Sequence, residues 1–233
     1  MATRGKLIAL EGIDGSGKRT QLDLLARSLQ ERGLPTFLIS FPRYESFYGK
    51  LVGRYLNGEF GELAAVDPHI SALLYAGDRL EAKPEIEAAL SSGKIVLSDR
   101  YIGSNMAHQS ARIPPEKRGE FQSWLKRLEY ELYGLPEEDL AMYLSVPVSE
   151  AHRLVGLKSA RAYTSLKRDI QEADMTHLEQ TAIIYDQLAT AANWARIDCI
   201  NPASGDLLSP EEIHQAVIKV VDARVLSQAS AGR

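Results

Sequence analysis

The sequence lacks several features that would each indicate a particular class of protein. Its 233 residues contain one cysteine, Cys199, which excludes a disulfide framework and a cluster of thiolate metal ligands. No apolar run approaches the ~20 residues needed to cross a bilayer, and no apolar leader segment follows Met1. The formal charge of −4 at pH 7 argues against general nucleic-acid binding. We therefore expect a cytoplasmic protein with neither a membrane nor a nucleic acid as partner.

A glycine-rich loop near the N-terminus is the most informative stretch that is present. The apolar run Leu7–Leu10 predicts a buried strand, and apolar residues at helical spacing follow between Leu22 and Leu29. Between them stands Gly12-Ile-Asp-Gly-Ser-Gly17, followed by Lys18. Glycines allow backbone N–H groups to surround an anion, the helix N-terminus adds partial positive charge, and lysine reaches terminal phosphates. The order strand, glycine-rich loop, lysine and helix predicts a nucleotide-phosphate loop.

One position of this loop departs from the usual motif. The hydroxyl residue that normally follows the lysine and contacts magnesium is replaced by Arg19, and Thr20 comes one residue late. One helical step rotates a side chain by about 100°, so Thr20 is a poor substitute ligand. Arg19 either brings positive charge to the phosphates or is a solvent-facing helix residue, and the sequence leaves both interpretations open.

Strands and helices are expected to alternate along the whole chain. This predicts an α/β fold of three layers, a five-stranded parallel sheet with helices on both faces. Without repeats or linkers, residues 1–226 form one domain and 227–233 a disordered tail. The expected strands are Leu7–Leu10, Thr36–Phe41, Lys94–Ser98, Leu140–Val146 and Trp194–Ile200. The expected helices are 18–33, 46–60, 67–80, 84–93, 114–132, 147–155, 169–192 and one starting at Ser209.

Three polar segments directly follow expected strands. They are Gly12–Lys18, Phe41–Tyr44 and Asp99–Tyr101. Because the carboxyl ends of parallel strands meet at one edge of a sheet, we expect these segments to form one ligand site. Asp99 is placed for magnesium and Arg100 for an anionic substrate, although the two could also form a buried ion pair. By itself, the pair Asp78-Arg79 would more often be solvated on a helix face.

Five segments together resemble the thymidylate kinase family of P-loop nucleoside-monophosphate kinases. They are EGIDGSGK at 11–18, FPRY at 41–44, YAGDR at 75–79, DRYIGSNMAHQ at 99–109 and DIQE at 169–172. The resemblance implies a P-loop NTPase fold and transfer of the γ-phosphate of ATP to dTMP, giving dTDP and ADP for dTTP biosynthesis. It further implies Mg²⁺ as cofactor and a homodimer.

The resemblance also implies roles for individual residues. The ATP phosphates would contact Gly12, Ile13, Asp14, Gly15, Ser16, Gly17, Lys18, Arg19 and Thr20. The acceptor dTMP would contact Phe41, Arg43, Tyr44, Tyr75, Arg79, Arg100, Asn105, His108 and Gln109. Catalysis would depend on Lys18, Asp14, Arg100 and Arg161, and magnesium on Asp14, Asp99 and Glu172.

Several of these assignments have ordinary structural alternatives. Tyr75 would stack on thymine but is also spaced as a core aromatic residue, and Asn105 and Gln109 would read the base edge but resemble surface amides. His108 stands where the family usually has tyrosine or phenylalanine, a ring that crowds the 2′ position of the sugar. Arg161 would act from a basic lid at about 153–168, because Gly15 stands where some members have a catalytic arginine; most such charge runs are solvated.

Two other functions remain open from the sequence. One is a kinase for another nucleoside monophosphate, and the other is a P-loop nucleotide-binding module that has lost transfer activity. Asp14, Arg79, Asp99 and Arg100 favour the enzyme, whereas Arg19 keeps the inactive module under consideration.

Overall fold

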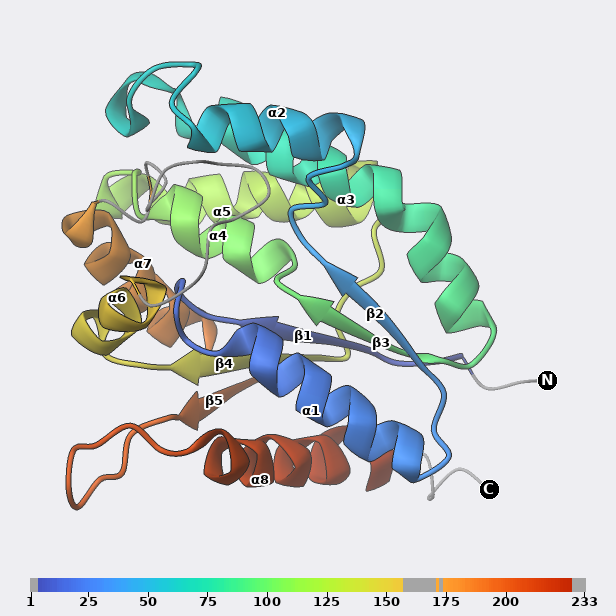
Figure 1. The fold of residues 1–233 in the computed structure, drawn as a ribbon. Coiled ribbons are helices and arrows are strands. Elements are labelled where there is room, and N and C mark those ends of the chain that lie inside the picture. Colours follow the sequence, from blue (N-terminus) through green and yellow to red (C-terminus); the bar gives the residue numbers. More distant parts are fainter. Residues whose placement is uncertain (1–3, 157–170, 172–173, 228–233) are drawn as a thin grey trace.

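Five parallel strands form one sheet in the order β2-β3-β1-β4-β5, in a computed structural model that describes residues 4–156, 171 and 174–227 (Figure 1). The strands are β1 (Leu7–Glu11), β2 (Thr36–Ser40), β3 (Ile95–Asp99), β4 (Leu140–Ser145) and β5 (Trp194–Asp198). The predicted α/β fold with a five-stranded parallel sheet is confirmed. Each strand is close to its predicted range because the apolar runs are short and bounded by polar or glycine residues.

The register of the sheet brings the three polar segments together. Leu10 of β1 and Ser40 of β2 both pair with Asp99 of β3, and Glu11 of β1 pairs with Tyr143 of β4. The carboxyl ends of β1, β2 and β3 therefore lie level with one another. From β1 the chain builds β2 and β3 on one side of β1, and it then crosses to the other side to form β4 and β5. The strand order therefore reverses beside β1, and ligands of open α/β sheets bind at such a reversal.

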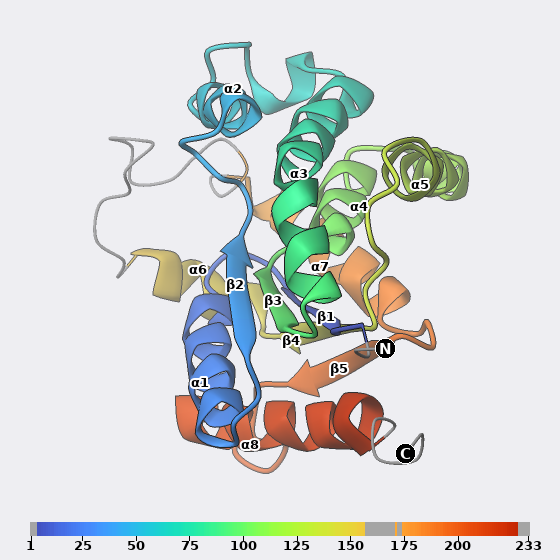
Figure 2. The ribbon, with the colours of Figure 1, turned by 90° about the vertical axis from the view of Figure 1, so that its right-hand side faces the viewer.

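Helices cover both faces of the sheet (Figures 1 and 2). α1 and α8 lie on one face, and α3, α4, α5 and α7 lie on the other, so the chain has the predicted three layers. Successive residues of β1 point to opposite faces of the sheet. Ile8 packs in the hydrophobic cluster that contains residues of α1 and α8, and Leu7 packs in the cluster that contains residues of α3 and α4. The helices are α1 (Lys18–Glu31), α2 (Phe47–Leu56), α3 (Pro68–Ser91), α4 (Ile102–Ser110), α5 (Arg118–Lys126), α6 (Val148–Gly156), α7 (Met175–Leu188) and α8 (Pro210–Val221).

Two predictions about helices are wrong. The expected break before Pro84 does not occur, since α3 continues through it from Pro68 to Ser91. An interior proline costs about 3 kcal/mol, but both halves of α3 bury side chains in the same core, including Ala76 and Ile86. The single helix expected over 114–132 is also wrong, because α5 ends at Lys126 and Leu132 is 68% exposed. A π-helical turn, Arg127–Leu132, follows α5 and shifts the angular positions of its side chains.

The other helix boundaries shift less. α2 begins after the N-cap Ser46 and ends at Leu56, short of residue 60. α7 begins at Met175, where the Asp174 side chain accepts a hydrogen bond from the His177 N–H, rather than at 169. Residues 157–170, 172–173 and 228–233 lie outside the described part of the chain, and with them most of the expected lid and tail.

Candidate active site

The loop after β1 has the geometry of a phosphate-binding loop. Gly17, with φ of 86°, is the N-cap of α1 and leaves the first N–H groups of the helix without a side-chain cap. Gly15, with φ of 88°, packs so closely on α6 that a Cβ there would lie 2.1 Å from the carbonyl oxygen of Ala151. Lys18 Nζ lies across the loop and donates to the carbonyl oxygens of Gly12 at 3.0 Å and Ile13 at 2.9 Å.

Arg100 adopts a backbone conformation that is strained for a residue with a side chain. Its φ of 65° lies in the left-handed region, and three hydrogen bonds hold it there. Its N–H donates to the Leu10 carbonyl at 2.9 Å, its carbonyl accepts from Ser98 Oγ at 2.5 Å, and the next N–H, of Tyr101, donates to Glu11 Oε1 at 2.9 Å. This conformation directs the guanidinium towards the loop after β1.

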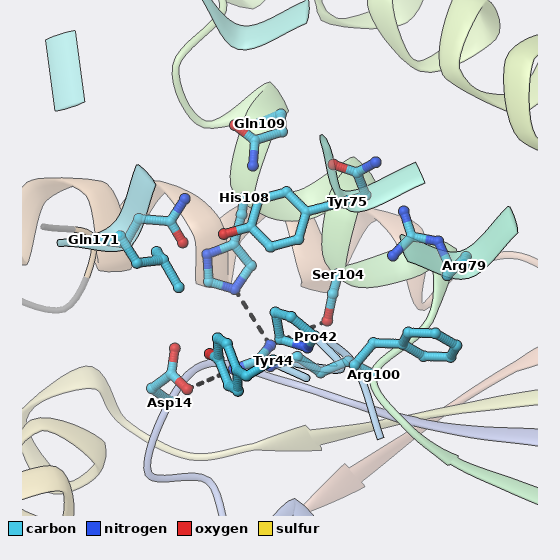
Figure 3. Close-up of a pocket in the computed structure, with 13 residues that line it drawn as sticks. Asp14, Pro42, Tyr44, Tyr75, Arg79, Arg100, Ser104, His108, Gln109 and Gln171 are labelled. Atoms are coloured by element: carbon cyan, nitrogen blue, oxygen red, sulfur yellow. Dashed lines mark hydrogen bonds and ion pairs between the residues drawn. The ribbon is translucent and has the colours of Figure 1, made fainter. Parts of the chain in front are cut away.

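The Arg100 guanidinium connects the loop after β1 to α4 at the carboxyl edge of the sheet (Figure 3). Nη2 donates to Asp14 Oδ1 at 2.7 Å, and Nη1 donates to the Gly12 carbonyl and to Ser104 Oγ, both at 3.0 Å. Burial alone would raise the pKa of Asp14, but the charges of Arg100 and Lys18 hold it below its usual range. Asp14 is therefore ionised at neutral pH.

His108 is a neutral side chain in this cluster. Burial, the positive charge of Arg100 and His177 together lower the pKa of His108 well below its usual value. Nη1 of Arg100 lies 3.4 Å from His108 Nε2, and arginine can only donate, so Nε2 is the accepting nitrogen. In this tautomer the proton is on Nδ1, which makes no hydrogen bond with the described part of the chain.

Glu11 is a buried carboxylate, and the sequence patterns indicated no role for it. It is fully buried at the end of β1 and accepts hydrogen bonds from Ser104 Oγ at 2.5 Å and Tyr185 Oη at 3.2 Å, besides the Tyr101 N–H. Burial raises the pKa of Glu11. The signal available in the sequence was an acidic residue closing an apolar strand, since such a residue needs partners to be buried.

Two adjoining pockets open at this edge of the sheet. One is lined by the glycine-rich loop, Lys18 and Asp99, and the other by Tyr75, Arg79 and residues of α4. They share five lining residues: Asp14, Phe41, Pro42, Tyr44 and Arg100. The pair Arg100–Asp14 therefore stands in the wall between them.

The second pocket contains three polar residues that proved to be buried. Asn105 and Gln109 are 2% and 0% exposed, so neither is a surface amide. Arg79 is 2% exposed and donates through Nε and Nη2 to Glu129, at 2.5 and 2.6 Å. Burial would lower the pKa of Arg79, but the Glu129 charge keeps it above its usual value. Tyr75 also lines this pocket, at an edge-to-face angle to Tyr55.

The turn Phe41–Tyr44 is held over the pockets by α3. Asp78, 1% exposed, accepts from the Arg43 N–H and from Ser46 Oγ, both at 2.7 Å. The alternative of a solvated Asp78–Arg79 pair is therefore excluded, because each residue is buried with a partner from another element. Arg43 Nη1 lies 3.2 Å from Glu85, and in the described structure the Arg43 side chain lines neither pocket.

The remaining predicted residues are placed as follows. Thr20 and Arg19 line the pocket around the glycine-rich loop, but the Arg19 side chain is 65% exposed and pairs with Asp23 at 3.0 Å. Ser16 Oγ is buried beside Gly12. Arg161 and Glu172 lie outside the described residues, whereas Gln171, which was not predicted, lines the second pocket.

Comparisons with known proteins agree with this geometry. The family model of thymidylate kinase matches residues 10–207. The chain belongs to the thymidylate kinase family. It is 33% identical to the thymidylate kinase of Mycobacterium tuberculosis over 192 residues, 81% of this chain and 87% of the relative. It is also 33% identical to a probable thymidylate kinase of Pyrococcus horikoshii over 225 residues, 96% of this chain and 98% of the relative.

The fold of this thymidylate kinase family member also matches a solved structure. The thymidylate kinase of Candida albicans superposes with a TM-score of 0.73 at 20% identity, covering 96% of this chain and 93% of that one. In the part of the chain that the structure describes, no helix is long and apolar enough to cross a membrane.

Proposed function

We propose that the pocket around the glycine-rich loop binds ATP and that the pocket beside α4 binds dTMP. The activity is that of a thymidylate kinase, a phosphotransferase acting on a nucleoside monophosphate. The observation that carries the assignment of the pockets is their common wall, formed by Arg100 and Asp14. Two nucleotides bound with their phosphates at this wall would meet end to end, as transfer requires.

The reaction moves one phosphoryl group between two anions. A phosphate oxygen of dTMP forms a bond to the γ-phosphorus of ATP while the bond to the bridging β,γ-oxygen breaks, giving dTDP and ADP. Positioning and charge stabilisation supply most of the catalysis, and no protein nucleophile is needed. Lys18 is suited to contact the terminal phosphates of ATP, and Arg100 to hold the dTMP phosphate against the repulsion of the donor.

The residues present fit a Mg²⁺ ion. Mg²⁺ is bound by one or two carboxylates together with phosphates and water, and Asp14 and Asp99 supply such carboxylates at the phosphate-loop pocket. Among the described residues no group of three or more His, Cys, Asp or Glu side chains is placed to hold a metal ion, so the nucleotide and water would supply the other ligands. When bound, the ion neutralises phosphate charge. Glu172 is a further proposed ligand.

The base of dTMP is proposed to lie between Tyr75 and the amides of α4. An aromatic ring is suited to stack on the thymine face, and Asn105 and Gln109 to read its polar edge. Arg79 Nη1, the group that Glu129 does not engage, is suited to the same edge. Phe41, Tyr44 and His108 line this pocket and complete the proposed surroundings of the acceptor. Arg43 would have to leave Glu85 to reach it.

Three further proposals concern the protein as a whole. A basic lid containing Arg161 would close over ATP and add positive charge during transfer. A homodimer is supported by large apolar side chains that are exposed, among them Phe47 at 67%, Ile70 at 54% and Leu132 at 68%. The cytoplasm is the proposed compartment.

A coupled assay of ADP release tests the proposed function. We expect turnover on dTMP that requires Mg²⁺ and that Lys18→Ala lowers at least ~100-fold, because the terminal phosphates lose their cation. Lys219→Ala, at an exposed position of α8, is the control and should leave turnover unchanged. A panel of nucleoside monophosphates separates the alternatives, since another preferred acceptor would correct the substrate and no turnover would indicate a binding module.

A further inference from the structure

Two amide side chains of α4 contribute to the pocket beside it with opposite polarity. Asn105 and Gln109 are four residues apart, so they lie on the same face of the helix, and both line this pocket. Each amide uses one of its two polar atoms within the protein. The other atom, Oδ1 of Asn105 and Nε2 of Gln109, is buried and has no hydrogen-bond partner among the described residues.

The chemistry of their partners fixes the orientation of both amides. Nδ2 of Asn105 donates to the Ala72 carbonyl at 3.0 Å and to Glu129 Oε1 at 2.9 Å, two groups that only accept. Oε1 of Gln109 accepts from Ser71 Oγ at 2.8 Å and from Arg112 Nη1 at 3.0 Å. A rotated Gln109 amide would bring its NH₂ group against the arginine, which only donates. The free polar atoms are therefore an acceptor from Asn105 and a donor from Gln109.

Arg112 is itself held firmly outside this pocket. Its Nη2 donates to the carbonyl oxygen of Leu63 at 2.6 Å and to that of Val66. Its Nη1 also donates to Tyr55 Oη at 3.2 Å and to Ser71 Oγ at 2.9 Å. These contacts bind the guanidinium to the segment before α3, so it meets Gln109 with a fixed donor. Ser71 could change its hydroxyl direction, whereas Arg112 cannot become an acceptor.

We propose that Arg112 is a positioning residue for base selection: it orients Gln109 so that the pocket presents a donor beside the acceptor of Asn105. A pyrimidine with a 4-oxo group and a 3-NH group offers the complementary acceptor and donor. A 4-amino pyrimidine such as cytosine offers the reverse pattern. Its 4-amino donor would face the donor of Gln109, and its N3 acceptor would face the acceptor of Asn105. The inference rests on the proposed function, because it requires the acceptor base in this pocket.

The mismatch is the source of the selectivity. A buried polar group that loses its partner is costly, and sites built to hydrogen-bond a substrate reject analogues that cannot complete the bonds. Without Arg112, the Gln109 amide could rotate and offer its oxygen to a 4-amino group. Arg112 would thus act on the choice between bases, and not on the phosphates.

The first experiment compares Arg112→Met with the parent for kcat/KM on dTMP and on dCMP. We expect the ratio of the two to fall at least ~10-fold, through a higher KM for dTMP and improved use of dCMP, with KM for ATP unchanged. Arg118→Met is the matched control. Arg118 is also half-buried and donates to the Ile113 carbonyl and to Gln180 Oε1. Because neither of these partners lines the pocket, the ratio of kcat/KM values in Arg118→Met should match the parent's.

A second variant tests the same inference without removing the anchor. Gln109→Glu keeps an oxygen for Arg112 and Ser71 but replaces the donor in the pocket by a second acceptor. We expect the ratio of kcat/KM for dTMP to that for dCMP to fall at least ~100-fold. The added negative charge repels both monophosphates alike, so it cancels in the ratio.

The outcomes separate the inference from the proposed function. A parent that phosphorylates neither monophosphate would overturn the proposed function and the inference with it. The inference alone would be overturned if the parent is selective for dTMP and both Arg112→Met and Gln109→Glu keep the parent's ratio of kcat/KM for dTMP to that for dCMP. If Arg112→Met lowers kcat/KM equally for dTMP and dCMP, Arg112 has only a structural role, and the inference is also overturned. If Arg112→Met does not fold, the ratio of kcat/KM for dTMP to that for dCMP in Gln109→Glu decides whether the inference holds.

Discussion

The guanidinium of Arg79 and the carboxylate of Glu129 form a buried two-bond ion pair across the wall of the proposed dTMP pocket. The hydrogen bonds measure 2.5 and 2.6 Å, and the side chains are 2% and 0% exposed. Glu129 also accepts from Asn105 Nδ2 at 2.9 Å. One carboxylate from the π-helical turn thus orients two side chains that line the pocket.

Removing Glu129 should destabilise the fold strongly. Glu129→Ala leaves a buried cation unpaired, so we expect a loss of roughly 3–5 kcal/mol in the free energy of unfolding, measured by urea denaturation. The double variant Arg79→Met with Glu129→Met should recover most of the lost free energy of unfolding, because no buried charge is left unpaired. Glu131→Ala, two residues away and 73% exposed, is the control and should cost below about 1 kcal/mol. A loss as small as the control's would contradict the buried ion pair.

Arg19 is expected to contribute to phosphoryl transfer despite its exposure. Its ion pair with Asp23 is an exposed i,i+4 pair worth about 0.3–0.5 kcal/mol, which bound phosphates can readily displace. Arg19→Ala should therefore lower kcat at least ~10-fold, about 1.4 kcal/mol of transition-state stabilisation, with KM for dTMP little changed.

Two further variants define the role of Arg19. Arg19→Ser restores the hydroxyl of the usual motif and should recover part of kcat at high magnesium concentration. Arg27→Ala, exposed two turns further along α1, should behave like the parent. Parent-like turnover of Arg19→Ala across a magnesium titration would show that Arg19 is only a solvent-facing helix residue.

His108 should weaken discrimination between deoxyribose and ribose. Its imidazole is smaller than the tyrosine or phenylalanine usual for the family, and its Nδ1–H is a donor that a 2′-hydroxyl can use. We expect the preference for dTMP over its ribose analogue, measured as the ratio of their kcat/KM values, to rise roughly 10-fold in His108→Tyr. The rise should come from a lower kcat/KM for the ribose analogue. The control is His69→Tyr, at an exposed position on α3. Equal preferences in the parent and His108→Tyr would refute this role.

Stability should fall as Glu138 ionises. Burial is the main cause that raises the pKa of Glu138 from 4.5 to about 7, although Tyr130 Oη donates to its carboxylate at 2.6 Å. The folded protein therefore binds a proton that the unfolded chain releases between these values. This contribution to stability is fully present below about pH 4.5 and is lost as the pH rises through about 7, on the order of 3 kcal/mol.

The pH dependence is measured as the difference between the parent and Glu138→Gln in urea denaturation from pH 4.5 to 8. His177, whose pKa burial lowers to about 4, gives an opposite slope at the acid end, but it is present in both proteins and cancels. Glu137→Gln, at the exposed neighbouring position, should reproduce the parent's curve. Parallel curves for the parent and Glu138→Gln would rule out titration of Glu138 in this range.

Features that depend only on neighbouring residues could be predicted from the sequence. The apolar run before Gly12, the glycines and Lys18 predicted a strand, loop and helix, because backbone freedom and hydrophobic spacing are local properties. The ends of β1 and β3 placed Asp14 and Arg100 at one edge of the sheet, because parallel strands align their carboxyl ends. These patterns were enough for the fold and for bringing the glycine-rich loop and Arg100 to one edge of the sheet.

The sequence did not reveal which polar residues are buried together, because that depends on contacts between distant segments. Arg79 and Glu129 are 50 residues apart in sequence, and Glu11 and Ser104 are 93 apart. No periodicity links such pairs, so the local pattern by itself favoured a solvated Arg79, and it indicated no role for Glu11. The packing of α3 through Pro84 depended in the same way on the core that both of its halves share. Local sequence sets which groups a chain carries, but burial of a charge or an amide depends on partners that only the folded chain brings within hydrogen-bond distance.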